Sequence, residues 1–154
     1  MSKPLKAVVA AKPKKKRTYN QYAALPYAVR NGDLAVMLVT SRETGRWVIP
    51  KGWPEKKLKG HQVAALEAYE EAGLIGEVAV KPIATFVYAK RLGETERKRC
   101  RVAVFLFAVH QELEDWPEKD QRKREWTTPK QAAARVSEKG LIKLLLGLKL
   151  AASG

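Results

Sequence analysis

Short hydrophobic runs rich in β-branched and aromatic residues alternate along the chain with polar segments, a pattern typical of β-strands. Asn31-Gly32 separates two such runs and is a strong signal for a tight hairpin turn. A longer hairpin is predicted around LGETE at 92–96, whereas KGWPEKKLKG at 51–60 has no apolar period and is predicted to be a loop. The pattern predicts strands at 21–30, 33–42, 45–50, 77–91, 98–113 and 124–126.

Three segments have the features of helices. The first runs from about His61 to Gly73, and Gly73 suits the C-terminal cap. The second follows Thr128, an N-cap candidate with Pro129 at the first helical position, and the third covers 137–150. Hairpins combined with helices imply a mixed sheet with helices packed on it, so the predicted fold class is α/β.

The composition is that of one ordinary globular domain. The chain has 154 residues, of which 45% are hydrophobic, enough for a core without a disulfide or a structural metal. Cys100 is the single cysteine, which excludes an intramolecular disulfide and fits a reducing compartment. No apolar run has transmembrane length, and the segment AVVAA near the start is too brief for a secretory leader. We therefore expect a cytoplasmic protein with no membrane partner.

The net charge of +14 is distributed unevenly. Residues 1–17 contain seven Lys or Arg and no acid, so we predict a basic flexible tail at 1–17 and a folded domain at 18–151. The tail either keeps the protein soluble or binds nucleic acid. The rest of the chain keeps 23 basic against 16 acidic residues, an excess that can line a site for a polyanion.

The first predicted helix gathers three acids on one face. Glu67, Glu70 and Glu71 fall within an arc of roughly 100°. One interpretation is a solvated acidic face, and the other is a set of carboxylates around a hard divalent cation such as Mg²⁺. No basic residue lies between His61 and Gly76 to balance these charges. We expect the opposite side of the helix to pack on the sheet, through Ala65, Ala68, Tyr69 and Ala72.

The loop and helix together resemble the Nudix box, G-x5-E-x7-R-E-U-x-E-E-x-G-U, where U is aliphatic. Gly52 takes the first glycine, Glu67 the acid of the Arg-Glu pair, and Glu70-Glu71 the paired acids, with Gly73-Leu74 closing the motif without a gap. Two positions depart from the motif, since Leu58 replaces its first glutamate and Leu66 its arginine. The resemblance implies a Nudix fold, a mixed β-sheet sandwiched between helices.

Further segments are similar to the diphosphoinositol polyphosphate phosphohydrolase branch of Nudix enzymes, which also cleaves diadenosine polyphosphates. These segments are RWVIP, EAYEEAGL, LEDW and RKREW, and the resemblance runs from about Arg17 to about Arg135. The branch has a basic cluster just before Ala23, where this chain has Asn20, Gln21 and Tyr22.

The resemblance implies a site that binds Mg²⁺, or Mn²⁺, and hydrolyses a phosphoanhydride bond. The implied metal ligands are Glu67, Glu71 and Glu70 together with the carbonyl of Gly52. Glu70 is the implied general base, with Glu67 as the reserve. A polyphosphate also needs cations, and arginine suits phosphate oxygens. The predicted substrate contacts are Arg42, Lys51, Arg97, Lys98, Arg99, Arg122 and Arg124.

Three functions remain open from the sequence. The first is a Nudix hydrolase, monomer or homodimer, that acts on a small dinucleoside or diphosphoinositol polyphosphate. The second removes pyrophosphate from RNA 5′ ends, with the basic tail binding the RNA. The third is a Nudix domain that has lost catalysis and binds nucleotide or nucleic acid; Leu58 and Leu66 favour it, and the three glutamates oppose it.

Overall fold

The computed structural model describes residues 17–150. The predicted basic tail lies outside the described residues except for Arg17, so the domain boundary at 17/18 stays a prediction. The strands are β1 Thr18–Arg30, β2 Asp33–Thr40, β3 Trp47–Val48, β4 Lys51–Gly52, β5 Leu74–Val78, β6 Ala84–Leu92, β7 Glu96–Glu112 and β8 Arg124–Thr127. The helices are α2 Gly60–Ala72, α3 Pro129–Arg135 and α4 Lys139–Gly147, with the 3₁₀ turn η1 at Lys119–Gln121.

One eight-stranded mixed sheet organises the molecule, with its main path in the order β3-β2-β1-β7-β5. β1 and β7 run parallel at its centre, paired from Thr18 with Arg99 to Tyr27 with Ala108. All other pairs are antiparallel, including β4 with β1, β6 with β7 and β8 with β2. The predicted α/β class is confirmed.

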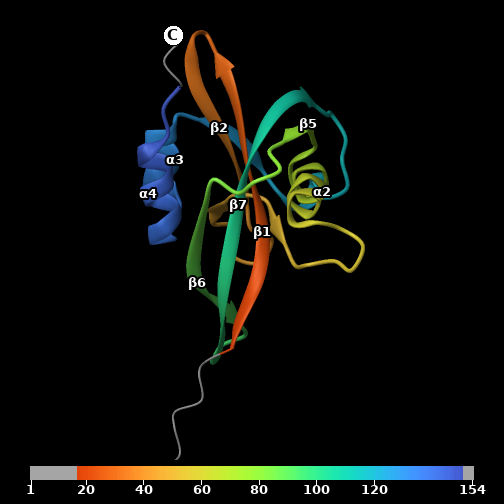
Figure 1. Ribbon diagram of the computed structural model, residues 1–154, viewed down its shortest axis with the longest axis vertical. Helices are drawn as coiled ribbons and strands as arrows, with labels where there is room; N and C mark the ends of the chain where they lie inside the picture. The colour runs from red at the N-terminus through yellow and green to blue at the C-terminus, as the bar shows by residue number, and fades with distance from the viewer. Residues whose placement is uncertain (1–16, 151–154) are drawn as a thin grey trace, which may run out of the picture.

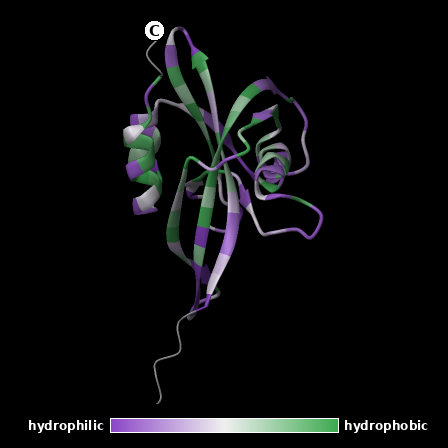
Figure 2. Ribbon diagram, in the orientation of Figure 1, coloured by the Kyte–Doolittle hydropathy of each residue, from purple (hydrophilic) through white to green (hydrophobic). Residues whose placement is uncertain are grey.

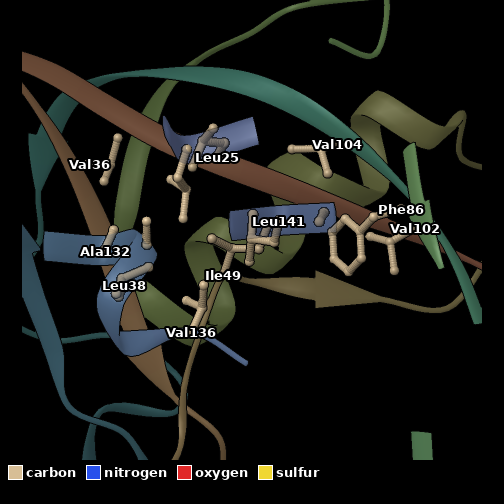
Figure 3. Close-up of a cluster of buried hydrophobic side chains, with 13 residues drawn as sticks. Leu25, Val36, Leu38, Ile49, Phe86, Val102, Val104, Ala132, Val136 and Leu141 are labelled. Atoms are coloured by element: carbon tan, nitrogen blue, oxygen red, sulfur yellow. The ribbon is translucent and has the colours of Figure 1, made fainter. Parts of the chain in front are cut away.

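The helices cover both faces of this sheet, α2 on one side and α3 with α4 on the other (Figure 1). Neighbouring residues of β1 alternate between the two cores, since Ala24 packs with Ala64 and Ala68 of α2. Leu25 packs on the other face with Leu141 of α4 (Figure 3). This second core holds Ala23, Leu25, Val36, Leu38, Ile49, Phe86, Val102, Val104, Ala132, Ala133, Val136, Leu141 and Leu145.

Local signals placed the turns and caps where the sequence predicts them. Asn31 and Gly32 have positive φ values of 54° and 82°, as a two-residue hairpin turn requires. Gly73 caps α2 in the left-handed conformation, with a φ of 65°. Thr128 caps α3, because its hydroxyl accepts a hydrogen bond of 3.1 Å from the Gln131 backbone N–H.

Three details differ from the predictions. The strand predicted at 77–91 is two strands, β5 and β6, separated around Pro82, which has no N–H for a ladder. Residues 51–52, predicted as loop, form β4 by pairing with Tyr22 and Ala23 of β1. Tyr69, predicted to pack, is 37% exposed. None of the helices within residues 17–150 has the length and apolar character needed to cross a bilayer.

We predict that Gly76→Ala destabilises the fold. Gly76 lies at a bulge in the β5–β7 pairing, and a β-carbon there would collide with the backbone oxygen of Ala108. Because a backbone atom cannot move aside as a side chain can, we expect a loss of about 1–3 kcal/mol in the free energy of unfolding. Gly147→Ala at the end of α4 is the control, since its β-carbon would meet open space. Chemical denaturation of both variants measures the difference, and equal stability would contradict the close approach.

Candidate active site

A cleft of about 740 Å³ opens where β4, the acidic face of α2 and the exposed end of β6 meet. The segment after β2 and the connection between α3 and α4 form its other walls. Figure 2 shows the strands turning from hydrophobic, where the helices cover them, to hydrophilic toward the β6–β7 hairpin. The cleft therefore lies where the core gives way to polar and charged side chains.

Gly52 allows the closest approach in this cleft. Its pairing with Tyr22 fixes β4 against β1, and α2 lies next to it. A β-carbon at Gly52 would collide with the carboxylate of Glu67. Only a glycine therefore lets the Glu67 side chain lie directly against the β4 backbone.

Glu71 is buried, with 4% of its surface exposed, and both of its carboxylate oxygens have partners. The backbone N–H of Lys51 donates to one oxygen at 3.1 Å, and the Arg122 guanidinium lies 3.0 Å from the other. Burial raises the pKa of Glu71, and the charge of Arg122 and the Lys51 hydrogen bond oppose part of that rise.

Glu67 carries a strongly perturbed carboxyl group. Burial and then the negative charges of Glu71 and Glu70 raise its pKa to about 8. A hydrogen bond with the Glu71 side chain contributes in the same direction. Burial also raises the pKa of Glu70, the most accessible of the three acids, with a further contribution from Glu118. The helix face thus concentrates negative charge that the protein itself neutralises only in part.

These residues fit a hard divalent cation in their chemistry. Carboxylate and carbonyl oxygens are the donors that Mg²⁺ prefers, and the glycine lets the Glu67 carboxylate lie directly against the β4 backbone. Within residues 17–150, no three acidic or other ligand side chains converge into a complete metal centre. Both oxygens of Glu71 already have partners, the Lys51 N–H and the Arg122 guanidinium. A metal that used Glu71 would compete with Arg122.

Glu118 belongs to the same charged network, although sequence reasoning missed it. Its carboxylate accepts from Arg122 Nε at 3.1 Å and lies 3.6 Å from Arg42 Nε. Its backbone N–H donates to the Glu70 carbonyl at 3.0 Å, which joins the segment before β8 to α2. Its spacing of four residues from Arg122 was the available signal, but a connection without predicted helix gave no reason to use it.

Comparison with known proteins decides the family. Residues 20–145 match the NUDIX domain family. The chain belongs to this family. It is 34% identical over 102 residues to Nudix hydrolase 12, mitochondrial, of Arabidopsis thaliana, a match that covers 64% of this chain and 50% of the relative. It is 31% identical over 126 residues to mouse diphosphoinositol polyphosphate phosphohydrolase 3-alpha, which covers 75% of this chain and 71% of that protein.

The same fold is found among solved structures. A Caenorhabditis elegans Ap4A hydrolase superposes with a TM-score of 0.59 at 15% identity, over 84% of this chain and 95% of that one. At this identity the likeness shows the fold alone. The chain spans about half the length of the plant relative, so the activity of the whole relative is not transferred by the match itself. The predicted Nudix membership and Nudix fold are confirmed.

The two departures from the Nudix box lie at half-buried positions, Leu58 and Leu66. The loop is held by local backbone bonds, since the Leu58 N–H donates to the Glu55 carbonyl at 3.2 Å. At the start of α2 the Lys59 N–H donates to the Gln62 side chain at 2.8 Å. Backbone and capping bonds therefore join the loop to the helix at this junction.

Four of the predicted substrate cations line the cleft: Arg42, Lys51, Arg97 and Arg122. Burial lowers the pKa of the Lys51 amine, although Glu138 and Glu71 oppose this shift. Its Nζ lies 5.5 Å from the centre of the Tyr88 ring. Arg122 has little freedom left, because it also donates to the Thr40 carbonyl at 2.9 Å.

Arg124 has a structural position instead of the predicted place in the cleft. Its two terminal nitrogens donate to the carbonyls of Ala72 and Leu113, at 2.8 and 2.7 Å. Its guanidinium also lies 4.0 Å from the centre of the Trp116 ring. Arg124 thus satisfies a carbonyl at the end of α2, and its fork is fully used there.

Lys98 and Arg99 also lie outside the cleft lining. Lys98 stands 4.5 Å from the centre of the Tyr19 ring, which turns its charge toward an aromatic group. Its cross-strand neighbour Lys90 does line the cleft, 5.1 Å from the centre of the Trp53 ring. Sequence reasoning missed Lys90, because only the pairing of β6 with β7 shows which hairpin cations face the cleft.

We predict that the stability of the metal-free protein falls as pH rises from about 4.5 to about 8. The folded state holds a proton on Glu67 through this window, whereas the unfolded state has released it. Mg²⁺ prefers the ionised carboxylates, so the stabilisation that it provides should grow over the same window. Thermal unfolding with and without Mg²⁺, from about pH 5 to about pH 9, measures both effects.

Glu67→Gln should flatten this pH dependence and reduce the stabilisation by Mg²⁺. Glu77→Gln, an exposed acid on β5, is the matched control and should behave like the parent. Equal stabilisation of Glu67→Gln and the parent by Mg²⁺ would show that Glu67 is not a ligand.

Proposed function

We propose that this Nudix domain is a metal-dependent pyrophosphohydrolase that cleaves a phosphoanhydride bond in a nucleoside polyphosphate. The carrying observation is the Glu67 carboxylate held against Gly52 beside Glu71, with its pKa raised to about 8, in a cleft that also has cationic walls. Clustered acids with perturbed pKa values in a cleft are typical of functional sites. Relatives named as hydrolases and phosphohydrolases support the same class of reaction.

Glu67, Glu71 and the carbonyl of Gly52 would hold Mg²⁺, or Mn²⁺. The bound metal supplies neutralisation of charge on phosphoryl oxygens and makes water a better nucleophile. Glu70 has the raised pKa and the exposure that suit a proton acceptor, so we assign it the removal of a proton from the attacking water. Water then adds to phosphorus as the bond to the leaving phosphate breaks.

The remaining phosphates need cations that lead away from the acids. Arg42 and Arg97 are exposed and line the cleft, and Lys51 and Lys90 extend the positive wall along β4 and β6. Arginine can bind phosphate oxygens with two parallel hydrogen bonds, whereas lysine acts as a point charge. Binding by such groups positions the polyphosphate for in-line attack.

The distribution of charge favours a linear polyphosphate over a fully phosphorylated ring. Gln21 is the β1 residue that lines the cleft. A basic residue at this position would face a ring phosphate, and this chain has none there. Relatives named for diphosphoinositol polyphosphates and a structural neighbour named for Ap4A leave both substrate classes in view. We propose a dinucleoside polyphosphate as the better substrate.

One observation favours a second candidate, a Nudix domain that binds without cleaving. Arg122 neutralises Glu71 at 3.0 Å, and such a pair could replace a metal ion permanently. The RNA alternative rests on the basic tail, which lies outside the described residues. Assembly and cellular compartment stay sequence predictions.

We predict that Glu67→Gln lowers turnover of a dinucleoside polyphosphate by at least about 10²-fold, the usual scale for losing a group that stabilises transition-state charge. The measurement is a side-by-side assay on dinucleoside polyphosphate, diphosphoinositol polyphosphate and triphosphorylated RNA, with Mg²⁺ and with Mn²⁺. Exposed Glu77→Gln is the control. No turnover of any substrate by the parent, together with binding, would favour the second candidate.

We predict that Arg97→Gln raises the KM for a dinucleoside polyphosphate more than Arg99→Gln does. Both arginines lie on β7 and are exposed, but Arg97 lines the cleft and Arg99 does not. A cation that contacts remote phosphates binds the ground and transition states alike, so kcat should change less than KM. Steady-state kinetics of the matched pair check this. Equal effects of the two changes would mean that the cleft wall has been placed wrongly.

A further inference from the structure

Glu138 places a buried carboxylate oxygen with no partner in the wall of the cleft. The residue precedes α4, and its Oε2 atom is inaccessible and accepts no hydrogen bond from residues 17–150. A buried acceptor left without a partner is costly and rare in folded proteins. The fold alone therefore does not explain why a glutamate stands at this position.

The sequence around Glu138 brings it onto the sheet. Gly140 lies against Phe86 of β6 so closely that a β-carbon would collide with it. Val136 is buried in the core below α3 and α4, which fixes the other side of the segment. Glu138 is thereby held near Tyr88, two residues beyond Phe86. Burial raises the pKa of the Tyr88 hydroxyl, and the charge of Glu138 contributes to that rise.

Two ordinary roles for a glutamate at this point fail. Its side chain makes no hydrogen bond to the start of α4, so it is not a helix cap. Among residues 17–150 it forms no ion pair, although Lys51 is near enough for the Glu138 charge to favour the protonated amine.

We propose that Glu138 is a specificity-determining residue whose carboxylate turns its unpartnered oxygen into the cleft when substrate binds, and there accepts a hydrogen bond from an uncharged N–H or O–H of the nucleoside part of the substrate. The inference rests on the proposed function and names the side of the cleft that determines substrate specificity. A nucleoside offers such donors on its base and on its ribose. A phosphorylated inositol offers oxyanions, which a carboxylate repels.

The neighbours of Glu138 agree with a nucleoside subsite. The Tyr88 hydroxyl donates to Gln21 Oε1 at 2.7 Å, so this part of the wall is polar, and among the described lining residues its cations include Lys51 and Lys90. The arginines of the cleft, such as Arg42 and Arg122, lie with the glutamates and Glu118. Phosphates bound beside these arginines would leave the nucleoside to the wall that holds Glu138.

The test compares Glu138→Ala with the parent on a dinucleoside polyphosphate and on a diphosphoinositol polyphosphate. We expect the KM for the nucleoside substrate to rise about 10-fold or more, because a charged hydrogen bond is lost, with a smaller change in kcat. The KM for the inositol substrate should fall, because a repelling charge is removed. Glu138→Gln keeps an acceptor and should restore part of the nucleoside binding.

The matched control is Glu43→Ala, which removes a negative charge from the exposed rim of the same cleft. Substrates that lack either the base amino group or the ribose 2′-hydroxyl identify the donor. For the substrate that lacks the donor, Glu138→Ala should no longer raise the KM. Parallel losses on both substrate classes would indicate a structural role and overturn the proposal. An effect no larger than that of Glu43→Ala would overturn it as well.

Calorimetric titration with adenosine and guanosine monophosphates separates this inference from the proposed function. Weaker binding to Glu138→Ala than to the parent supports the subsite even if the parent hydrolyses no polyphosphate. Equal binding to the two proteins overturns the subsite even if the parent is active.

Discussion

The close approach of β4 to α2 at Gly52 is the constraint on which the rest of the site depends. Because no side chain stands at that position, the Glu67 carboxylate lies against the strand backbone, in the environment that raises its pKa. The same approach lets the Lys51 N–H bond to Glu71 one turn further along the helix. A single glycine therefore sets the position of two carboxylates, and it does so through main-chain pairing with β1. Rigid elements, not loops, hold the acids, and such placement favours a well-ordered site.

The charges around these acids are balanced by residues that come late in the chain. Arg122 joins Glu71 and Glu118, and Trp116 donates to the Glu71 carbonyl at 3.1 Å. Arg124 then holds the end of α2 through Ala72. These bonds tie β8 and the segment before it to α2. Removing Arg122 would leave the buried Glu71 without its ion-pair partner, which costs more than the pair contributes. We infer that the segment at 116–124 supports the acidic face as much as it supports the sheet.

Local chemistry explains which parts of the structure could be predicted from the sequence. The Asn31-Gly32 turn, the Gly73 cap and the Thr128 cap depend on neighbouring residues, and all three form as predicted. β4 could not be predicted, since two residues become a strand only by pairing with β1. The positions of the cations likewise depend partly on local sequence and partly on distant contacts. Their residue type suggests phosphate binding, but whether a guanidinium is free depends on distant carbonyls. The carbonyls of Ala72 and Leu113 occupy Arg124, whereas Lys90 reaches the cleft from the opposite strand.

Positive and negative side chains occupy different parts of the cleft, and this arrangement limits which ligands can bind in it. Glutamates of α2 occupy one end, arginines stand beside them, and Glu138, on the connection before α4, adds a second negative group near Lys51 and the β6 residue Lys90. A uniformly anionic ligand would meet repulsion at Glu138 wherever it turned, unless Lys51 screened the charge. A ligand with phosphates at one end and neutral donors at the other meets attraction on both walls. Because specificity is a difference between affinities, one repelling carboxylate can select between such ligands without weakening the phosphate site. Under the proposed function, Gln21 in place of a basic residue would act in the same direction, since a cation that attracts a ring phosphate would be missing from the wall where Glu138 would add repulsion.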